Sequence, residues 1–151
     1  MDHEVRLLDA AADPTAVVAA ATTWAEFPSL WGRLLDEVYA VVRADDTIIR
    51  GHNVMLYLDD LPHVEVGIQV TGTLQPAGQV VASALPAGRA AATVHRGSYD
   101  GLGGAHRAVK KWCAANGHAL TGVRWEIYGD WHEDQADMEV EIRYLLRDCS
   151  G

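Results

Sequence analysis

One order of elements occurs twice along the chain, and this repetition restricts the folds open to it. The segment "VHRGSYDGLGGAHRAVK" aligns with "TTWAEFPSLWGRLLDEV" at an offset of 72 residues. The segments "GVRWEIY" and "GHNVMLY" align at an offset of 71, and "MEVEIRY" and "VEVGIQV" align at an offset of 74. Three segments in one order with nearly one offset indicate two modules, each with the order strand, helix, strand, strand.

Local patterns support each of these elements. "SYDGLGGAHRAVKKWCAANG" has apolar residues at helical spacing, with Ser98 or Asp100 as the N-cap and Asn116-Gly117 as a left-handed stop. The preceding "GRAAATVHRG" is rich in alanine, but it is short, bounded by glycines and contains β-branched Thr93, so it is predicted as a strand. The segments "GVRWEIYGD" and "ADMEVEIRYLL" alternate as half-buried strands do.

Each module is expected to open with one more strand, at Val5 to Leu8 and at Gln79 to Ala84, and "TGTLQPAGQ" separates the modules. Neither half could readily bury its apolar faces alone. The sequence therefore predicts a single α+β domain over residues 1–151, with half-repeats at about 1–72 and 78–147. The expected architecture is an antiparallel sheet with two helices, made of pseudo-symmetric strand-strand-helix-strand-strand modules and a central ligand cleft where they meet.

Charge excludes two classes of partner. The 12 basic and 21 acidic residues give a formal charge of -9, which repels nucleic acid phosphates and anionic membrane surfaces. The apolar run from Ala16 to Ala21 is too short to span a bilayer. Two cysteines, Cys113 and Cys149, make no disulfide framework, and the charged N-terminus lacks a secretory signal pattern, so a reduced cytoplasmic protein is expected.

One carboxylate lies within an aromatic strand, "RWEIYGDW". Alternation places Arg124, Glu126 and Tyr128 on one face of this strand, and Val123, Trp125 and Ile127 on the other, with Trp125 expected in the core. The counterpart of Glu126 in the first module is Met55, so one acid breaks the symmetry. Glu126 is either an ordinary strand acid, facing solvent or paired with Arg124, or a carboxylate in the cleft.

The second half of the chain resembles the GyrI-like small-molecule-binding family, which includes effector domains of AraC- and MerR-type regulators and stand-alone proteins. The resemblance runs from about Leu85 to Leu146. It is carried by His95-x-Gly97-x-Tyr99, by the helix that ends at "WCAANG", and by Glu126-Ile127-Tyr128. Residues 1–75 match in pattern only, as the first half-repeat.

This resemblance implies a function and a set of ligand contacts. In the family, the cleft between two repeated modules takes bulky, planar, often cationic organic molecules, and Glu126 corresponds to the acid at its floor. Aromatic walls would add stacking and cation-π attraction of roughly 0.5 to 2 kcal/mol each. The expected ligand contacts are Glu126, Trp24, Trp31, Tyr57, Met55, Tyr99, Tyr128 and Trp131. For the tryptophans and the repeat-related Tyr57 and Tyr128, the alternative is ordinary packing in the core or a loop.

Other kinds of site find no support in the sequence. The histidines and cysteines show no metal-ligand spacing, and His106 is interpreted as a surface or core histidine. "GLGG" lacks the pattern of a nucleotide-binding loop, and "WHEDQAD" has too few regularly spaced oxygens for calcium. No metal and no cofactor are therefore expected.

Three functions follow from the resemblance. The first is a stand-alone multidrug-type binding protein for lipophilic aromatic or cationic compounds, with a role in antibiotic resistance. Because the chain has no helix-turn-helix pattern, any regulatory role would need another protein. The second is a hydrolase of cyclopropane-bearing DNA-alkylating natural products, with Glu126, Tyr57 and Tyr128 as acid and base groups. The third is a DNA gyrase-interacting protein with an acidic surface.

Overall fold

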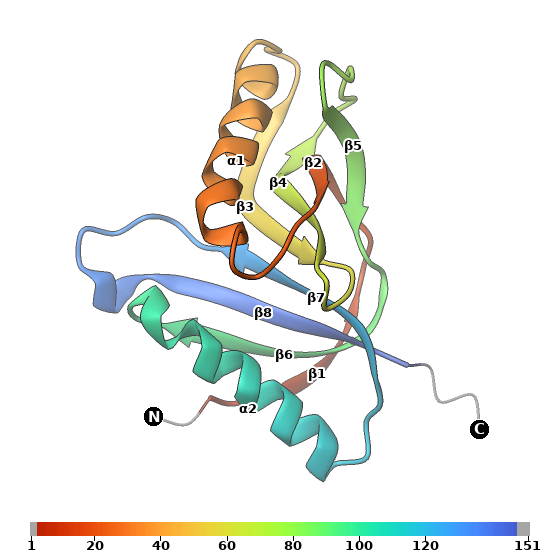
Figure 1. The fold of residues 1–151 in the computed structure, drawn as a ribbon, viewed down its shortest axis with the longest axis vertical. Coiled ribbons are helices and arrows are strands. Elements are labelled where there is room, and N and C mark those ends of the chain that lie inside the picture. The colour runs from red at the N-terminus through yellow and green to blue at the C-terminus, as the bar shows by residue number, and fades with distance from the viewer. Residues whose placement is uncertain (1–2, 148–151) are drawn as a thin grey trace. The chain divides into compact units, whose positions relative to one another are not determined.

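Two compact units share the chain, and the computed structural model describes residues 3–147 of it (Figure 1). Cys149 lies outside the described residues. Unit 1 comprises residues 3–11 and 86–147, and unit 2 comprises residues 12–85. Within the described chain, each unit contains four strands, all paired antiparallel inside their unit, and one helix of more than three turns.

Unit 1 places one helix on a four-stranded sheet. Its elements are β1 (Arg6–Ala10), β6 (Gly88–Arg96), the 3-10 turn Tyr99–Gly101, α2 (Leu102–Ala115), β7 (Leu120–Tyr128), the 3-10 turn Gln135–Asp137 and β8 (Glu139–Leu146). The strand order is β1-β6-β8-β7. Helix α2 packs on β6 and β8 (Figure 1).

Unit 2 has the same composition of elements. These are β2 (Asp13–Ala21), α1 (Phe27–Arg43), β3 (Ile49–Tyr57), β4 (His63–Thr71) and β5 (Val80–Leu85), with the strand order β3-β4-β2-β5. Helix α1 packs on β2 and β4. The predicted α+β class, with antiparallel strands and two helices, is confirmed.

The first strand of each half of the sequence belongs to the unit that the other half mainly forms. Strand β1 pairs with β6, and strand β5 pairs with β2. Each compact unit therefore consists of a continuous strand-helix-strand-strand segment plus one strand taken from the other half of the sequence. The half-repeats expected at about 1–72 and 78–147 stay a prediction. The compact units have other bounds, because β1 lies in unit 1 and β5 lies in unit 2.

Both helices bury one stripe of side chains at a spacing of four residues. Helix α1 buries Leu34, Val38 and Val42, and α2 buries Ala105, Val109 and Cys113. Burial also raises the pKa of the Cys113 thiol.

The predicted stop of α2 is a Schellman motif. Gly117 has φ of +75°, and the His118 amide donates to the Cys113 carbonyl at 2.9 Å. At the other end, Ser98 caps the 3-10 turn that precedes α2, since its hydroxyl accepts from the Asp100 amide, and α2 itself begins at Leu102.

Both units also contain a β-bulge at the corresponding strand. Strand β3 shifts register against β4 between Arg50 and Asn53, and β7 shifts against β8 between Leu120 and Arg124. Gly122, with φ of +96°, lies in the second bulge. No helix within residues 3–147 is long and apolar enough to cross a membrane.

Close pairing of β4 with β2 requires glycine at position 67. A Cβ atom there would lie 1.8 Å from the backbone oxygen of Ala16, which cannot move without breaking the pairing of the two strands. We expect Gly67→Ala to lower the free energy of unfolding by about 3 kcal/mol or more, as measured by urea denaturation.

Gly32 provides the control, because a Cβ atom at this position of α1 meets nothing within 4 Å. Gly32→Ala should raise the free energy of unfolding by about 0.5 to 1 kcal/mol through helix propensity. Equal stability of the two variants would contradict the proposed close approach of β4 to β2.

Candidate functional site

The carboxylate of Glu126 is buried on the helix-covered face of unit 1. Glu126 lies opposite Ile142 on β8, and Ile142 belongs to the apolar core under α2. The residue is 3% exposed, so the alternative of a solvent-facing strand acid is wrong. Trp125, on the other face of β7, is fully buried, as predicted.

Three side chains from three elements are joined to this carboxylate, two of them directly and one through His106. Nε2 of His106, on α2, lies 2.6 Å from Oε2 of Glu126. Nδ1 of the same ring lies 2.6 Å from the Tyr144 hydroxyl, on β8. The Tyr128 hydroxyl donates to Oε1 of Glu126 at 2.8 Å. A buried carboxylate needs such partners, because desolvation disfavours its charged form.

A path of aromatic rings leads from the surface to this carboxylate. The Tyr99 ring, in the turn before α2, meets the Tyr128 ring edge to face, with centroids 5.5 Å apart. Tyr99 is 45% exposed, whereas Tyr128 is half-buried. Partial burial raises the pKa of the Tyr99 phenol. Tyr99, Tyr128 and Glu126 thus follow one another from solvent into unit 1.

The predicted site residues of the first half form a second group, in unit 2. The ring centroids of Trp24 and Tyr57 lie 5.5 Å apart, and Phe27 meets Tyr57 edge to face at 5.7 Å. The Trp24 indole donates to the Asp60 carbonyl at 2.9 Å, yet the residue is 46% exposed. The Tyr57 hydroxyl donates to the sulfur of buried Met55 at 3.7 Å.

The other two predicted tryptophans lie outside these groups of contacts. Trp31 is on α1 and 40% exposed. Trp131 follows β7 in unit 1 and is 73% exposed. Their roles as ligand contacts stay predictions.

The sequence analysis missed His106 and Tyr144 as members of the Glu126 network. A signal for His106 was present, because it follows Leu102 by four residues and precedes Val109 by three, which is the buried side of α2. Tyr144 carries no comparable signal. In the sequence, Tyr144 occupies one of the apolar positions of an alternating strand. Only the register of β8 against β7 shows that its hydroxyl belongs to the Glu126 network.

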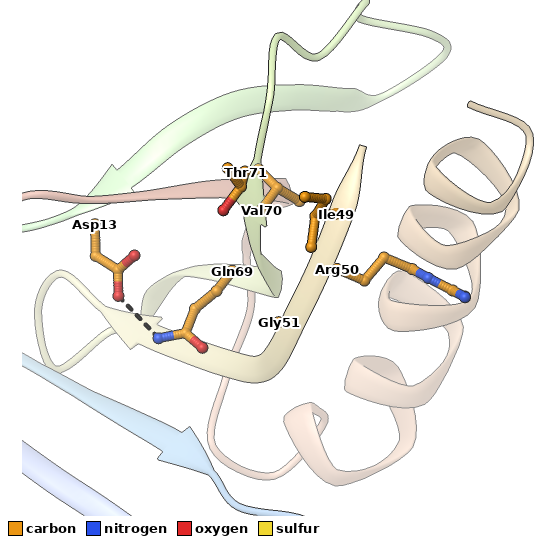
Figure 2. A pocket seen from close by; sticks show the side chains of 7 residues that line it. All are labelled: Asp13, Ile49, Arg50, Gly51, Gln69, Val70 and Thr71. Carbon is orange, nitrogen blue, oxygen red and sulfur yellow. Dashed lines mark hydrogen bonds between the residues drawn. The ribbon is translucent and has the colours of Figure 1, made fainter. Parts of the chain in front are cut away.

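A separate hollow of about 260 Å³ lies at the bulge of β3 in unit 2 (Figure 2). Its polar centre is a hydrogen bond from the Gln69 amide to the Asp13 carboxylate, at 2.8 Å, while Arg50 extends away from this pair (Figure 2). The Gln69 side-chain oxygen also accepts from the His52 amide at 3.0 Å. The hollow contains none of the predicted ligand contacts. No group of three metal-binding side chains occurs in the described chain.

We expect His106→Ala to lower the free energy of unfolding by about 3 kcal/mol, because it removes the ring that contacts both the buried Glu126 carboxylate and the Tyr144 hydroxyl. Urea denaturation at neutral pH measures this loss. Arg107→Ala, at the exposed neighbouring position of α2, should change stability by no more than about 0.5 kcal/mol. Similar values for the two variants would show that the His106 contacts contribute little.

Comparisons with known proteins identify the fold. No protein-family model and no curated protein sequence match the chain. The EcmrR C-terminal domain has a TM-score of 0.82 at 20% identity, with 98% of this chain and 99% of that domain covered. In the EcmrR-DNA complex, the chain spans 58% of the EcmrR chain, with a TM-score of 0.80 at 20% identity.

SAV2435 bound to tetraphenylphosphonium has a TM-score of 0.63 at 14% identity, covering 97% of this chain and 94% of that one. A hydrolase from Listeria innocua has a TM-score of 0.69 at 9% identity, covering 97% and 93%. The chain therefore has the fold of the EcmrR C-terminal domain, and the predicted GyrI-like fold is confirmed.

Proposed function

We propose that this chain is a small-molecule-binding domain whose ligands are bulky, aromatic and cationic, and that Glu126 is the charged group that selects them. The observation that carries the proposal is the buried Glu126 carboxylate behind the half-exposed Tyr99 and Tyr128 rings. An aromatic cation that binds beside these rings would leave water and contact the two tyrosine rings and the Glu126 carboxylate. Cation-π contacts contribute roughly 0.5 to 2 kcal/mol each.

Two of the structural neighbours support this class of function. SAV2435 has been solved with tetraphenylphosphonium, a bulky lipophilic cation with four phenyl rings. The EcmrR C-terminal domain shares the fold over nearly the whole of both chains. Within unit 2, the exposed rings of Trp24 and Trp31, with Met55 and Tyr57, are proposed as ligand contacts.

Titration with tetraphenylphosphonium tests the proposal. Isothermal calorimetry at about pH 8 should give micromolar binding by the wild type. Glu126→Gln keeps the shape of the side chain and removes its charge, so affinity should fall by about tenfold or more, which is about 1.4 kcal/mol. Fluorescence anisotropy with a rhodamine tests a planar cation in the same way.

Glu139→Gln is the matched control. It removes the same charge from an exposed position of β8, where Glu139 forms an ion pair with Arg96 at 3.4 Å. Exposed pairs contribute little, so this variant should bind and fold as the wild type does. Failure of the wild type to bind either cation, or equal affinity of Glu126→Gln, would overturn the assignment of Glu126 as the selecting charge.

Hydrolysis is a second candidate function, favoured by the hydrogen bond between Tyr128 and Glu126 and by the neighbour described as a hydrolase. With a cyclopropane conjugated to a carbonyl, Glu126 would take a proton from water as the oxygen attacks a ring carbon. The electron pair of the broken ring bond would pass to the carbonyl, and a tyrosine hydroxyl would donate to the developing oxyanion; Tyr128 could do so by turning its hydrogen from Glu126 to that oxygen. Tyr57 remains the other predicted donor.

The hydrolase proposal has a different signature in Glu126→Gln. Because such substrates are neutral, the variant should keep ligand affinity and lose turnover, as followed by liquid chromatography of substrate and hydrated product. Turnover equal to that of the wild type would exclude Glu126 as the base.

A further inference from the structure

His106 is a titratable ring in direct contact with the carboxylate that the proposed function assigns to cation binding. Its Nε2 atom lies 2.6 Å from the Glu126 carboxylate. Histidine is also the side chain whose charge ordinarily changes between about pH 5 and pH 8. The charge presented by the Glu126 site therefore depends on the state of its nearest partner.

The hydrogen bonds around the ring accommodate both of its charge states. A carboxylate accepts, so Nε2 carries hydrogen in either state. Nδ1 faces the Tyr144 hydroxyl at 2.6 Å, and a hydroxyl can either donate or accept. Neutral His106 accepts from Tyr144 at Nδ1, and protonated His106 donates to it. Protonation thus changes the charge of the site without requiring a side chain to move.

We propose that His106 is a specificity-determining residue, which admits aromatic cations to the Glu126 site when it is neutral and rejects them when it is protonated. The inference rests on the proposed function. With neutral His106, the site keeps the negative charge of the carboxylate, which attracts a ligand cation. With protonated His106, an ion pair of 2.6 Å already neutralises that charge, and an incoming cation meets a like charge beside it.

Other ionisable groups lie on the elements around His106, and protonation of Glu126 itself would also weaken cation binding, so a variant of His106 is needed to separate the two. The groups are Glu126, Arg124 and Tyr128 on β7, Tyr144 on β8, His95 on β6, Tyr99 and Asp100 in the turn before α2, and Cys113 on α2 itself. Arg124 is charged throughout this pH range, and tyrosine and cysteine are neutral in it. Burial moves the pKa values of Tyr99 and Cys113 further upward. The His95 ring binds the Ser98 carbonyl at 2.8 Å and the His3 ring at 3.1 Å rather than Glu126.

The sign of the effect follows from linkage. The cation prefers neutral His106, so binding the cation releases a proton, and acidification weakens cation binding. Because one proton is involved, the affinity can fall by at most about tenfold per pH unit. An anion of the same shape should respond in the opposite direction.

Tetraphenylphosphonium and tetraphenylborate provide this comparison, because they have nearly the same shape and opposite charge. We would measure both affinities by calorimetry from about pH 8 to about pH 5, at constant ionic strength, for the wild type and His106→Gln. In the wild type, phosphonium affinity should fall by about tenfold or more, while borate affinity should rise. The glutamine amide can donate to Glu126 but cannot titrate, so the phosphonium affinity of the variant should stay nearly constant with pH, whatever its absolute value.

Tyr144→Phe is a second variant that keeps the histidine. It removes the hydroxyl that accepts from protonated Nδ1, and a hydrogen bond from a charged donor is the stronger of the two. The fall in phosphonium affinity should therefore move to lower pH. This variant keeps the inference testable if His106→Gln does not fold.

The outcomes separate the inference from the function on which it rests. Phosphonium binding at pH 8 that depends on Glu126 but does not change on acidification would overturn the role of His106 and leave the proposed function intact. An unchanged pH profile in His106→Gln would assign the effect to another group. Absence of phosphonium binding by the wild type at pH 8 would overturn both.

Discussion

The burial of one carboxylate is the constraint on which the organisation of unit 1 depends. A charge removed from water is costly unless hydrogen bonds or an opposite charge replace its hydration. Glu126 obtains these partners from α2 and from its own strand, and the network continues to β8. The position of α2 on the sheet therefore has two consequences. It buries Ala105, Val109 and Cys113, and it brings His106 to the carboxylate.

Two local features of the chain fix the ends of α2. A glycine in the left-handed region ends the helix at its C-terminus, and a capped 3-10 turn precedes its start. The same turn carries Tyr99, whose ring contacts Tyr128. The turn at the N-terminal end of the helix therefore also places an aromatic ring beside the tyrosine that donates to the buried carboxylate.

The sequence predicts the elements of this fold well because their signals are local. Alternation identified β7 and β8, the Asn116-Gly117 stop ended α2 correctly, and the face assignment of Glu126 and Trp125 agrees with their burial. Pairing between distant segments is harder to predict from the sequence. The exchange of β1 and β5 depends on long-range strand pairing, and the contacts of His106 join residues that are 20 and 38 positions apart. These contacts depend on helix rotation and on strand register, which periodicity alone does not determine.

A comparison of the two units explains why the acid is found in only one of the two corresponding positions. Each unit has an aromatic ring packed edge to face on a strand tyrosine, Phe27 on Tyr57 and Tyr99 on Tyr128. Each of these tyrosines donates to the residue two positions before it, Met55 in one unit and Glu126 in the other.

The difference extends beyond that single position. Strand register places Val64 opposite Tyr57 and Val140 opposite Tyr128, an offset of 76 rather than the 74 expected from the sequence. With this offset, Ile68 is the counterpart of Tyr144, and the buried stripes of the two helices make Leu35 the counterpart of His106. Glutamate, histidine and tyrosine in unit 1 thus replace methionine, leucine and isoleucine in unit 2. A carboxylate at position 126 without His106 would lose its 2.6 Å contact to the ring, which makes its burial more costly. The three polar residues therefore form one hydrogen-bonded network in unit 1, at positions that are apolar in unit 2.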